Sequence, residues 1–182
     1  MEDLLSLQTR VRRYQEVLGN TENYRTDWHE QLKPFILNRL KTITEAVQLD
    51  CKIEVKDQMR NLETIILSLG VSKSGIYEKI DEDTEKAFIK SNGALVYQQL
   101  FNGKVQVMII YPHIEGYGKP GQPKIIAIYR PNEIKEPFIV RHLEDFMKEI
   151  TTWEDFDDDN PPVSRPIGFD VASVPSKIDE ET

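Results

Sequence analysis

The fold of this chain is decided by residues 95–110, which read LVYQQLFNGKVQVMII. Asn102-Gly103 stands in this stretch between two runs that are rich in residues favoured in β-strands. An Asn-Gly pair suits a type I′ turn, which needs positive φ at both central positions and matches the twist of paired strands. The stretch therefore predicts a β-hairpin with a two-residue loop.

A two-residue loop also predicts which side chains lie opposite each other. Tyr97 is expected opposite Met108, and Leu95 opposite Ile110, so that these four share one face. The other face is apolar as well, and one layer of helices would leave the first face bare. Because a large exposed apolar patch marks an interaction site, we expect either helices on both faces or a second molecule over this one, with a symmetric dimer favoured.

Three further strands are expected around this hairpin. Apolar and charged residues alternate over 51–56, which predicts a strand with one wet face. Residues 62–69 and 124–130 are predicted as two more strands. Residues 71–92 are polar and lack sustained periodicity, and a short helix is expected there over 83–90.

The amino-terminal region predicts an amphipathic helix that ends at Gly19-Asn20, a pair that tolerates left-handed dihedrals. Its apolar stripe has spacings of three and four: Leu4, Leu7, Val11, Tyr14 and Leu18. Two interpretations are open. The stripe packs on the domain's own core, which we favour, or it is the seam of a self-pairing helix, since the same spacing matches a coiled coil.

Two more helices are expected. One starts with Asp27 as its cap and Glu30 in a capping-box position, and runs to about Leu49; Pro34 either kinks it or begins a fresh helix. The other closes the domain over 137–153. Its expected buried stripe leaves out His142, which is expected to be solvated, and comprises Phe138, Val140, Leu143, Phe146, Met147 and Ile150.

The sequence thus predicts an α+β fold, with a roughly five-stranded, mainly antiparallel sheet flanked by two amino-terminal helices and one carboxy-terminal helix. Residues 1–153 form the single domain, with a helical part over 1–50, the sheet over 51–130 and the closing helix over 137–153. Residues 154–182 are an acidic, proline-containing tail that is expected to be disordered.

The net charge of −8 belongs mostly to this tail. Residues 154–182 hold nine acidic and two basic residues, which leaves −1 for the rest, so nucleic-acid binding is disfavoured. The apolar runs are too short to span a bilayer, and one cysteine, Cys51, permits no intrachain disulfide. A cytoplasmic location without membrane contact is expected. Phe169, in an apolar island of the tail, is either a docking motif or a clip on the body.

Several patterns approach known sites but lack residues that those sites require. Gly70 to Gly75 resembles a phosphate loop but is followed by Ile76 and Tyr77, where Lys and Ser or Thr are required. No histidine has a second ligand at a metal-binding spacing, and Cys51 is expected to be a small buried side chain. No cofactor or metal is predicted.

The 111–123 loop is where candidate chemistry clusters. Tyr111, His113, Glu115 and Tyr117 offer acid, base and hydrogen-bonding groups on a glycine-containing segment that could approach a ligand. The simpler interpretation, which we favour, is a long hairpin connection whose glycines and prolines serve only the turns.

The order of elements over residues 30–152 resembles two known groups. One is the GAF/PAS-type sensory domains, whose sheet and flanking helices hold a small ligand. The other is the secretion-chaperone-like fold, which is acidic, dimeric and binds extended partner chains. We predict a non-catalytic protein-interaction module, dimeric and with a protein partner; the alternatives are a small-molecule sensor with a pocket near Tyr97, Met108 and Tyr111, or an enzyme that uses the 111–123 loop.

Overall fold

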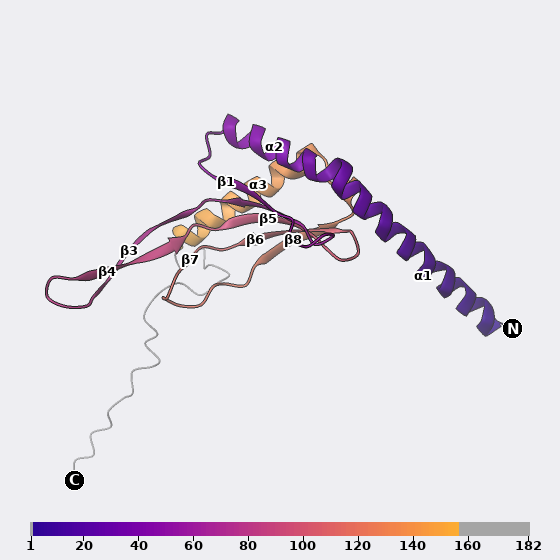
Figure 1. The fold of residues 1–182 in the computed structure, drawn as a ribbon, viewed down its shortest axis with the longest axis horizontal. Helices are drawn as coiled ribbons and strands as arrows, with labels where there is room; N and C mark the ends of the chain where they lie inside the picture. Colours follow the sequence, from indigo (N-terminus) through magenta and orange to yellow (C-terminus); the bar gives the residue numbers. More distant parts are fainter. Residues whose placement is uncertain (1, 157–182) are drawn as a thin grey trace, which may run out of the picture.

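The computed structural model describes residues 2–156. Five helical elements occur in this part of the chain: α1 (Glu2–Asp27), a π-helical turn η1 (Trp28–Leu32), α2 (Lys33–Ala46), a 3-10 turn η2 (Pro131–Glu133) and α3 (Glu136–Glu154). The strands are β1 (Lys52–Lys56), β2 (Thr64–Ser68), β3 (Val71–Lys79), β4 (Glu85–Ser91), β5 (Ala94–Gln99), β6 (Val105–Ile110), β7 (His113–Ile114) and β8 (Lys124–Tyr129). Figure 1 shows their arrangement.

The main sheet has five strands in the order β1-β2-β5-β6-β8, and every neighbouring pair is antiparallel. These are the five strands expected from the sequence, so the predicted α+β class with a five-stranded antiparallel sheet is confirmed. A second sheet of three strands, β3-β4-β7, extends from it. The tail that the sequence predicts to be disordered begins at Glu154, which is the last residue of α3; residues 157–182 lie outside the described part of the chain.

The helix expected over 83–90 is wrong. This segment forms β4, which pairs with β3 in a long antiparallel hairpin that projects from the body (Figure 1). The alternation that would have predicted two strands is interrupted by a register shift between Lys73 and Tyr77, around Gly75 with φ +79°. Most side chains of the hairpin are exposed, so no buried face imposes a hydrophobic period on it.

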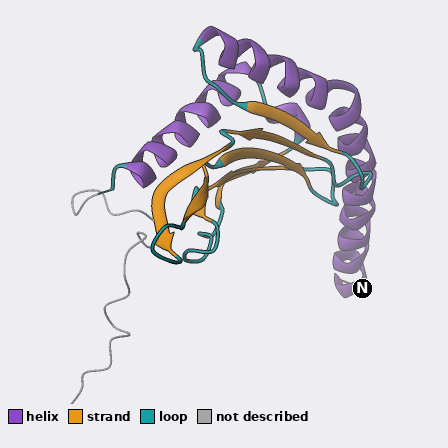
Figure 2. Cartoon of the chain, turned by 60° about the vertical axis from the view of Figure 1, so that its left-hand side comes forward, coloured by secondary structure: helices purple, strands orange, loops and turns teal. Residues whose placement is uncertain are grey.

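The core lies between one face of the main sheet and the helices α2 and α3 (Figure 2). Alternate residues of the central strands point into it, as expected for strands with one covered face. The fully buried apolar residues of the sheet are Ile65, Leu67, Leu95, Tyr97, Val105, Val107 and Ile109, and α2 and α3 contribute Ile36, Leu40, Ile139 and Phe146.

The predicted hairpin between β5 and β6 is present, but its predicted register is wrong by one residue. Tyr97 pairs with Val107 and Leu95 pairs with Ile109. The loop is one residue longer than expected: the amide of Gly103 donates to the carbonyl of Leu100 (2.8 Å), and Gly103 alone takes the left-handed conformation, with φ +77°. This is a type I turn closed by a glycine bulge, the common form of a three-residue hairpin loop.

The shift separates the four residues predicted to share an interaction face. Leu95 and Tyr97 point into the core and are fully buried, whereas Met108 and Ile110 point to the opposite face. A slip of one residue reverses a strand's faces, because side chains alternate along it. Leu95 and Tyr97 are therefore core residues.

The first helix does not end at Gly19-Asn20. Helix α1 continues to Asp27, which has helical dihedrals (φ −58°, ψ −39°) and makes no side-chain cap, so the predicted cap there is also wrong. Nothing packs within 4 Å of the position where a Gly19 Cβ would lie, and a single glycine costs a helix only about 1 kcal/mol. Pro34 occupies the first turn of α2, one of the two expected outcomes.

The closing helix α3 is confirmed within one residue at each end, but its buried stripe differs from the prediction. His142 is fully buried and belongs to this stripe, with Ile139 beside it, while Val140 is exposed. The expectation of a solvated His142 is wrong because both nitrogens of its ring have hydrogen-bonding partners in the protein, the hydroxyls of Tyr97 and Tyr129.

Candidate functional site

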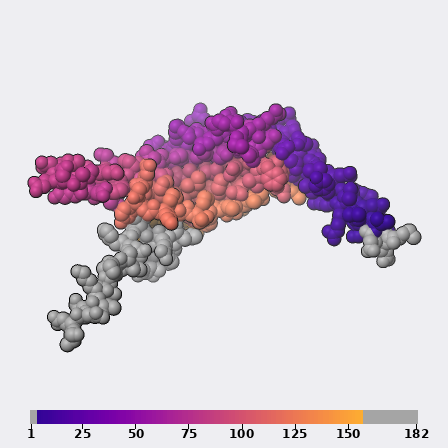
Figure 3. Space-filling model, turned by 60° about the horizontal axis from the view of Figure 1, so that its bottom comes forward, coloured from indigo at the N-terminus to yellow at the C-terminus, as the bar shows by residue number. Residues whose placement is uncertain are grey.

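The apolar stripe of α1 lies on a helix that projects from the body (Figures 1 and 3). Its five residues, Leu4, Leu7, Val11, Tyr14 and Leu18, are between 47% and 63% exposed. The interpretation that the stripe packs on the domain's own core is therefore wrong. Most helical stability in proteins comes from packing of an apolar face, and in the single chain this stripe has no such packing.

The base of α1 rests on the tip of the β5-β6 hairpin. The guanidinium of Arg25 donates to the carbonyl oxygen of Phe101 (2.8 Å). A Cβ on Gly103 would lie 2.7 Å from Tyr24 Cβ and 2.9 Å from the Thr21 carbonyl oxygen, so the helix backbone sits directly on this glycine. The contact holds only the last turns of α1 and leaves residues 4–18 free of the body.

A buried ionic cluster lies where α1 meets α2. The carboxylate of Glu63 accepts hydrogen bonds from the Lys33 ammonium (2.7 Å) and the Trp28 indole (3.2 Å), and His29 Nδ1 lies 3.5 Å away. Burial alone would raise the pKa of Glu63, but the bonds from Lys33 and Trp28 outweigh it and hold that pKa below its ordinary value. Trp28 begins the π-helical turn and Lys33 follows it, so Glu63 ties both of its ends to the sheet.

The second face of the main sheet carries a row of apolar side chains. Ile66, Val96, Met108 and Ile125 lie side by side across four strands, as their register shows. In Figure 2 the helices α2 and α3 lie on the other side of the sheet, and no helix of residues 2–156 crosses this concave side. We call this side the open face; Ile110 and Ile128 on it are exposed, whereas Val96 near its centre is buried.

The 111–123 loop separates its candidate residues. Tyr111 is buried and its hydroxyl donates to Glu149 Oε2 (2.6 Å), while Lys124 donates to the other oxygen of Glu149 (2.6 Å). Burial and the neighbouring carboxylate both raise the pKa of Tyr111. This arrangement joins the loop to α3, which is a structural role for Tyr111.

The other loop residues turn toward the projecting hairpin. His113 pairs with Ser91 as part of β7, and the amide of Glu115 donates to the Ile89 carbonyl (2.9 Å). Glu115 and Tyr117 line a hollow of about 930 Å³ beside β3 and β4, where Tyr117 packs edge-on against Phe88 at 6.0 Å between ring centroids. His113 is not among the residues that line this hollow, and Tyr111 lies away from it.

The rings of Tyr97, Tyr129 and His142 pack together near Tyr97, where the sensor alternative predicts a ligand pocket. The hydroxyl of Tyr97 lies 3.1 Å from Nδ1 of His142, and the hydroxyl of Tyr129 lies 3.1 Å from Nε2. Burial lowers the pKa of His142 to about 4, so the ring is neutral, with one nitrogen donating and the other accepting. Since Met108 lies on the open face and Tyr111 beside α3, Tyr97, Met108 and Tyr111 do not line one space.

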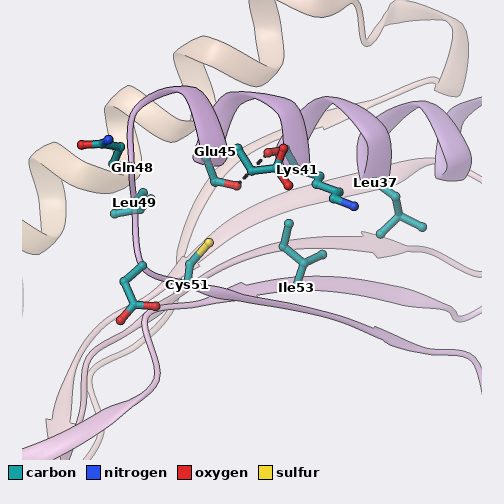
Figure 4. A pocket seen from close by; sticks show the side chains of 9 residues that line it. Leu37, Lys41, Glu45, Gln48, Leu49, Cys51 and Ile53 are labelled. Atoms are coloured by element: carbon teal, nitrogen blue, oxygen red, sulfur yellow. Dashed lines mark hydrogen bonds between the residues drawn. The ribbon is translucent and has the colours of Figure 1, made fainter.

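Cys51 lies in a shallow pocket of about 580 Å³ between α2 and β1. Figure 4 shows its sulfur pointing toward α2, among Leu37, Leu49 and Ile53. Burial raises the pKa of the thiol; a hydrogen bond with Thr44 offsets part of this effect, and the nearby Asp50 adds a smaller increase. The thiol is therefore protonated at neutral pH, as expected for a small partly buried side chain rather than a nucleophile.

Comparison with protein-family models, with curated proteins and with solved structures finds no match to this chain. Within residues 2–156, no helix combines the length and the hydrophobicity that crossing a membrane requires. Phe169, the remaining predicted interaction residue, lies outside the described residues. The geometry itself therefore has to indicate function.

The sequence analysis missed two features of this geometry. The Glu63 cluster had no local signal, because Trp28, Lys33 and Glu63 are brought together only by the fold. His142 did have one, since it stands three residues after Ile139 and four before Phe146, the spacing of one helix face.

Proposed function

We propose that this protein is a non-catalytic interaction module that assembles as a dimer through α1. The observation that carries the proposal is the exposed stripe on the projecting helix. Residues 4, 7, 11, 14 and 18 repeat at three and four, the spacing of a two-stranded coiled-coil seam. A second copy presents the same stripe, so the surface is complementary to itself, as a two-fold interface requires.

The charges of α1 are compatible with this pairing. Gln8, Arg10, Gln15 and Val17 flank the stripe at the positions that face a partner helix across a coiled coil. Only Arg10 among them is charged, and a parallel in-register pair sets it beside Gln15 of the partner subunit. The flanks therefore bring no pair of like charges together, and pairing shields apolar side chains that are exposed in the single chain.

The dimer would leave the body free for a protein partner. The contact at Gly103 and the Glu63 cluster hold the last turns of α1 against the sheet, so that the helix is presented away from the body. Cytoplasmic location and the absence of nucleic-acid binding stay predictions from composition.

The test is the mass of the full-length protein in solution, measured by analytical ultracentrifugation over a concentration series. We expect a dimer, and dissociation in the double variant Leu7→Gln, Val11→Gln. In the dimer, pairing buries the part of each apolar side chain that is exposed in the single chain. Each substitution removes this gain, about 1 kcal/mol, so the four substitutions in a dimer weaken association about a thousandfold.

A matched control compares single leucine substitutions inside and outside the stripe. Leu5 lies outside the stripe and its flanking positions, and it is 63% exposed, close to the 55% of Leu7. Leu5→Gln should leave the dimer unchanged, whereas Leu7→Gln alone should weaken association about thirtyfold, because each dimer then loses two such burials of about 1 kcal/mol. A monomeric wild-type protein at high concentration, or equal weakening by Leu5→Gln and Leu7→Gln, would refute assembly through the stripe.

A further inference from the structure

The free edge of the main sheet suggests a second docking event, independent of α1. β8 is one of the two outermost strands, opposite β1, and its sequence KIIAIY contains one charge, Lys124, at its start. Ile125 and Ile128 are 55% and 52% exposed. Edge strands present unpaired backbone groups and are usually guarded by charges, prolines or bulges. β8 has two features that hinder pairing with a further strand: the charge of Lys124, and a bulge opposite Val107 and Met108.

The chain leaves the body close to this edge. Glu149 of α3 binds Lys124, the first residue of β8, at 2.6 Å. α3 ends at Glu154, about 8 Å further along the helix axis. The ten residues 157–166 can span about 33 Å, whereas the six residues of β8 cover about 20 Å. The segment that follows them can therefore reach any point along β8.

The sequence of that segment matches what the edge offers. Residues 167–171 read Ile-Gly-Phe-Asp-Val, with apolar side chains at every second position. In a strand, Ile167, Phe169 and Val171 would share one face. That face would continue the apolar row of the open face, next to Ile125 and Ile128.

We propose that residues 167–171 bind the free edge of β8 of their own chain as a sixth strand. Their apolar side chains then cover the exposed isoleucines on the open face. Strand addition supplies backbone hydrogen bonds, and alternate side chains supply selectivity. The tether gives the segment an effective concentration of about 1 mM at the edge of β8. Even a weak pairing, with a dissociation constant of about 0.1 mM, would then make docked chains about ten times as abundant as undocked ones.

Hydrogen exchange of the full-length protein, followed by mass spectrometry, tests this proposal. In the variant Phe169→Asp we expect the peptide covering 124–129 to exchange about tenfold faster at its edge amides than in wild type. Ile178→Asp, which places the same charge outside the segment, should leave this peptide unchanged. The peptide covering β5 serves as the internal reference for an intact core. Equal exchange of 124–129 in wild type and both variants would overturn the proposal.

Disulfide trapping separates docking within one chain from docking between copies. In a Cys51→Ser background, cysteines at Ile128 and Phe169, oxidised with copper phenanthroline, should form a bond within one chain. This bond is seen as a single-chain mass under denaturing, non-reducing conditions, with both thiols resistant to alkylation until a reductant is added; thiols that stay open to alkylation after oxidation would overturn the proposal. A linked pair of chains instead would overturn docking on the same body. Neither experiment depends on the dimer seam, because Leu7→Gln with Val11→Gln should change association and leave the exchange of 124–129 as it is.

Discussion

Replacing Gly103 with alanine tests the contact on which the projection of α1 depends. Gly103 has φ +77°, and a Cβ there would lie 2.7 Å from Tyr24 Cβ and 2.9 Å from the Thr21 carbonyl oxygen. The left-handed conformation costs alanine about 1–2 kcal/mol. Overpacking against the helix adds about 1–3 kcal/mol. We therefore expect Gly103→Ala to lower the free energy of unfolding by about 2–5 kcal/mol.

Gly70 provides the control for this substitution. It has a similar φ of +74°, and nothing lies within 4 Å of a Cβ built there, so Gly70→Ala should cost only the conformational part, about 1–2 kcal/mol. Gly103→Asn separates the two contributions further, because asparagine tolerates positive φ and still carries the Cβ. Urea denaturation followed by circular dichroism measures all three. Equal losses for Gly103→Ala and Gly70→Ala would refute the packing of α1 on the hairpin tip.

Two further predictions concern buried polar groups. Because burial holds the pKa of His142 at about 4, below the ordinary 6.5, the unfolded chain takes up a proton between pH 6.5 and 4 that the folded chain does not. Stability should fall across this window by up to about 3 kcal/mol, and by less in His142→Gln; parallel pH profiles in urea unfolding would contradict this. Lys33→Met leaves Glu63 buried without its cation and should cost about 1.5–3 kcal/mol, whereas Lys52→Met breaks an exposed pair with Glu54 and should cost less than about 1 kcal/mol. Similar losses for both lysine variants would show that burial does not strengthen the Glu63 pair.

The elements that could be predicted are those whose own sequence carries a period. β1, β2 and the closing helix were located within one or two residues, because alternation and helical spacing are local properties. The β3-β4 hairpin was missed for the same reason: its residues are solvated, and its alternation is interrupted at Gly75. The register of the β5-β6 hairpin was predicted wrongly, because Asn-Gly suits both a two-residue and a three-residue loop.

By itself, the sequence determined the α+β class, the strands of the main sheet and the apolar stripe of α1, since each follows from a periodic pattern within one continuous segment. Only the tertiary structure decided which of two apolar faces the helices cover, and it decided that the stripe of α1 extends past the body instead of packing on it. Both decisions depend on contacts between distant segments: the register at Gly103 sends Tyr97 inward and Met108 outward, and the hairpin tip meets α1 only at its last turns. Such contacts leave no period in the chain, because each involves a few residues separated by a long stretch of sequence.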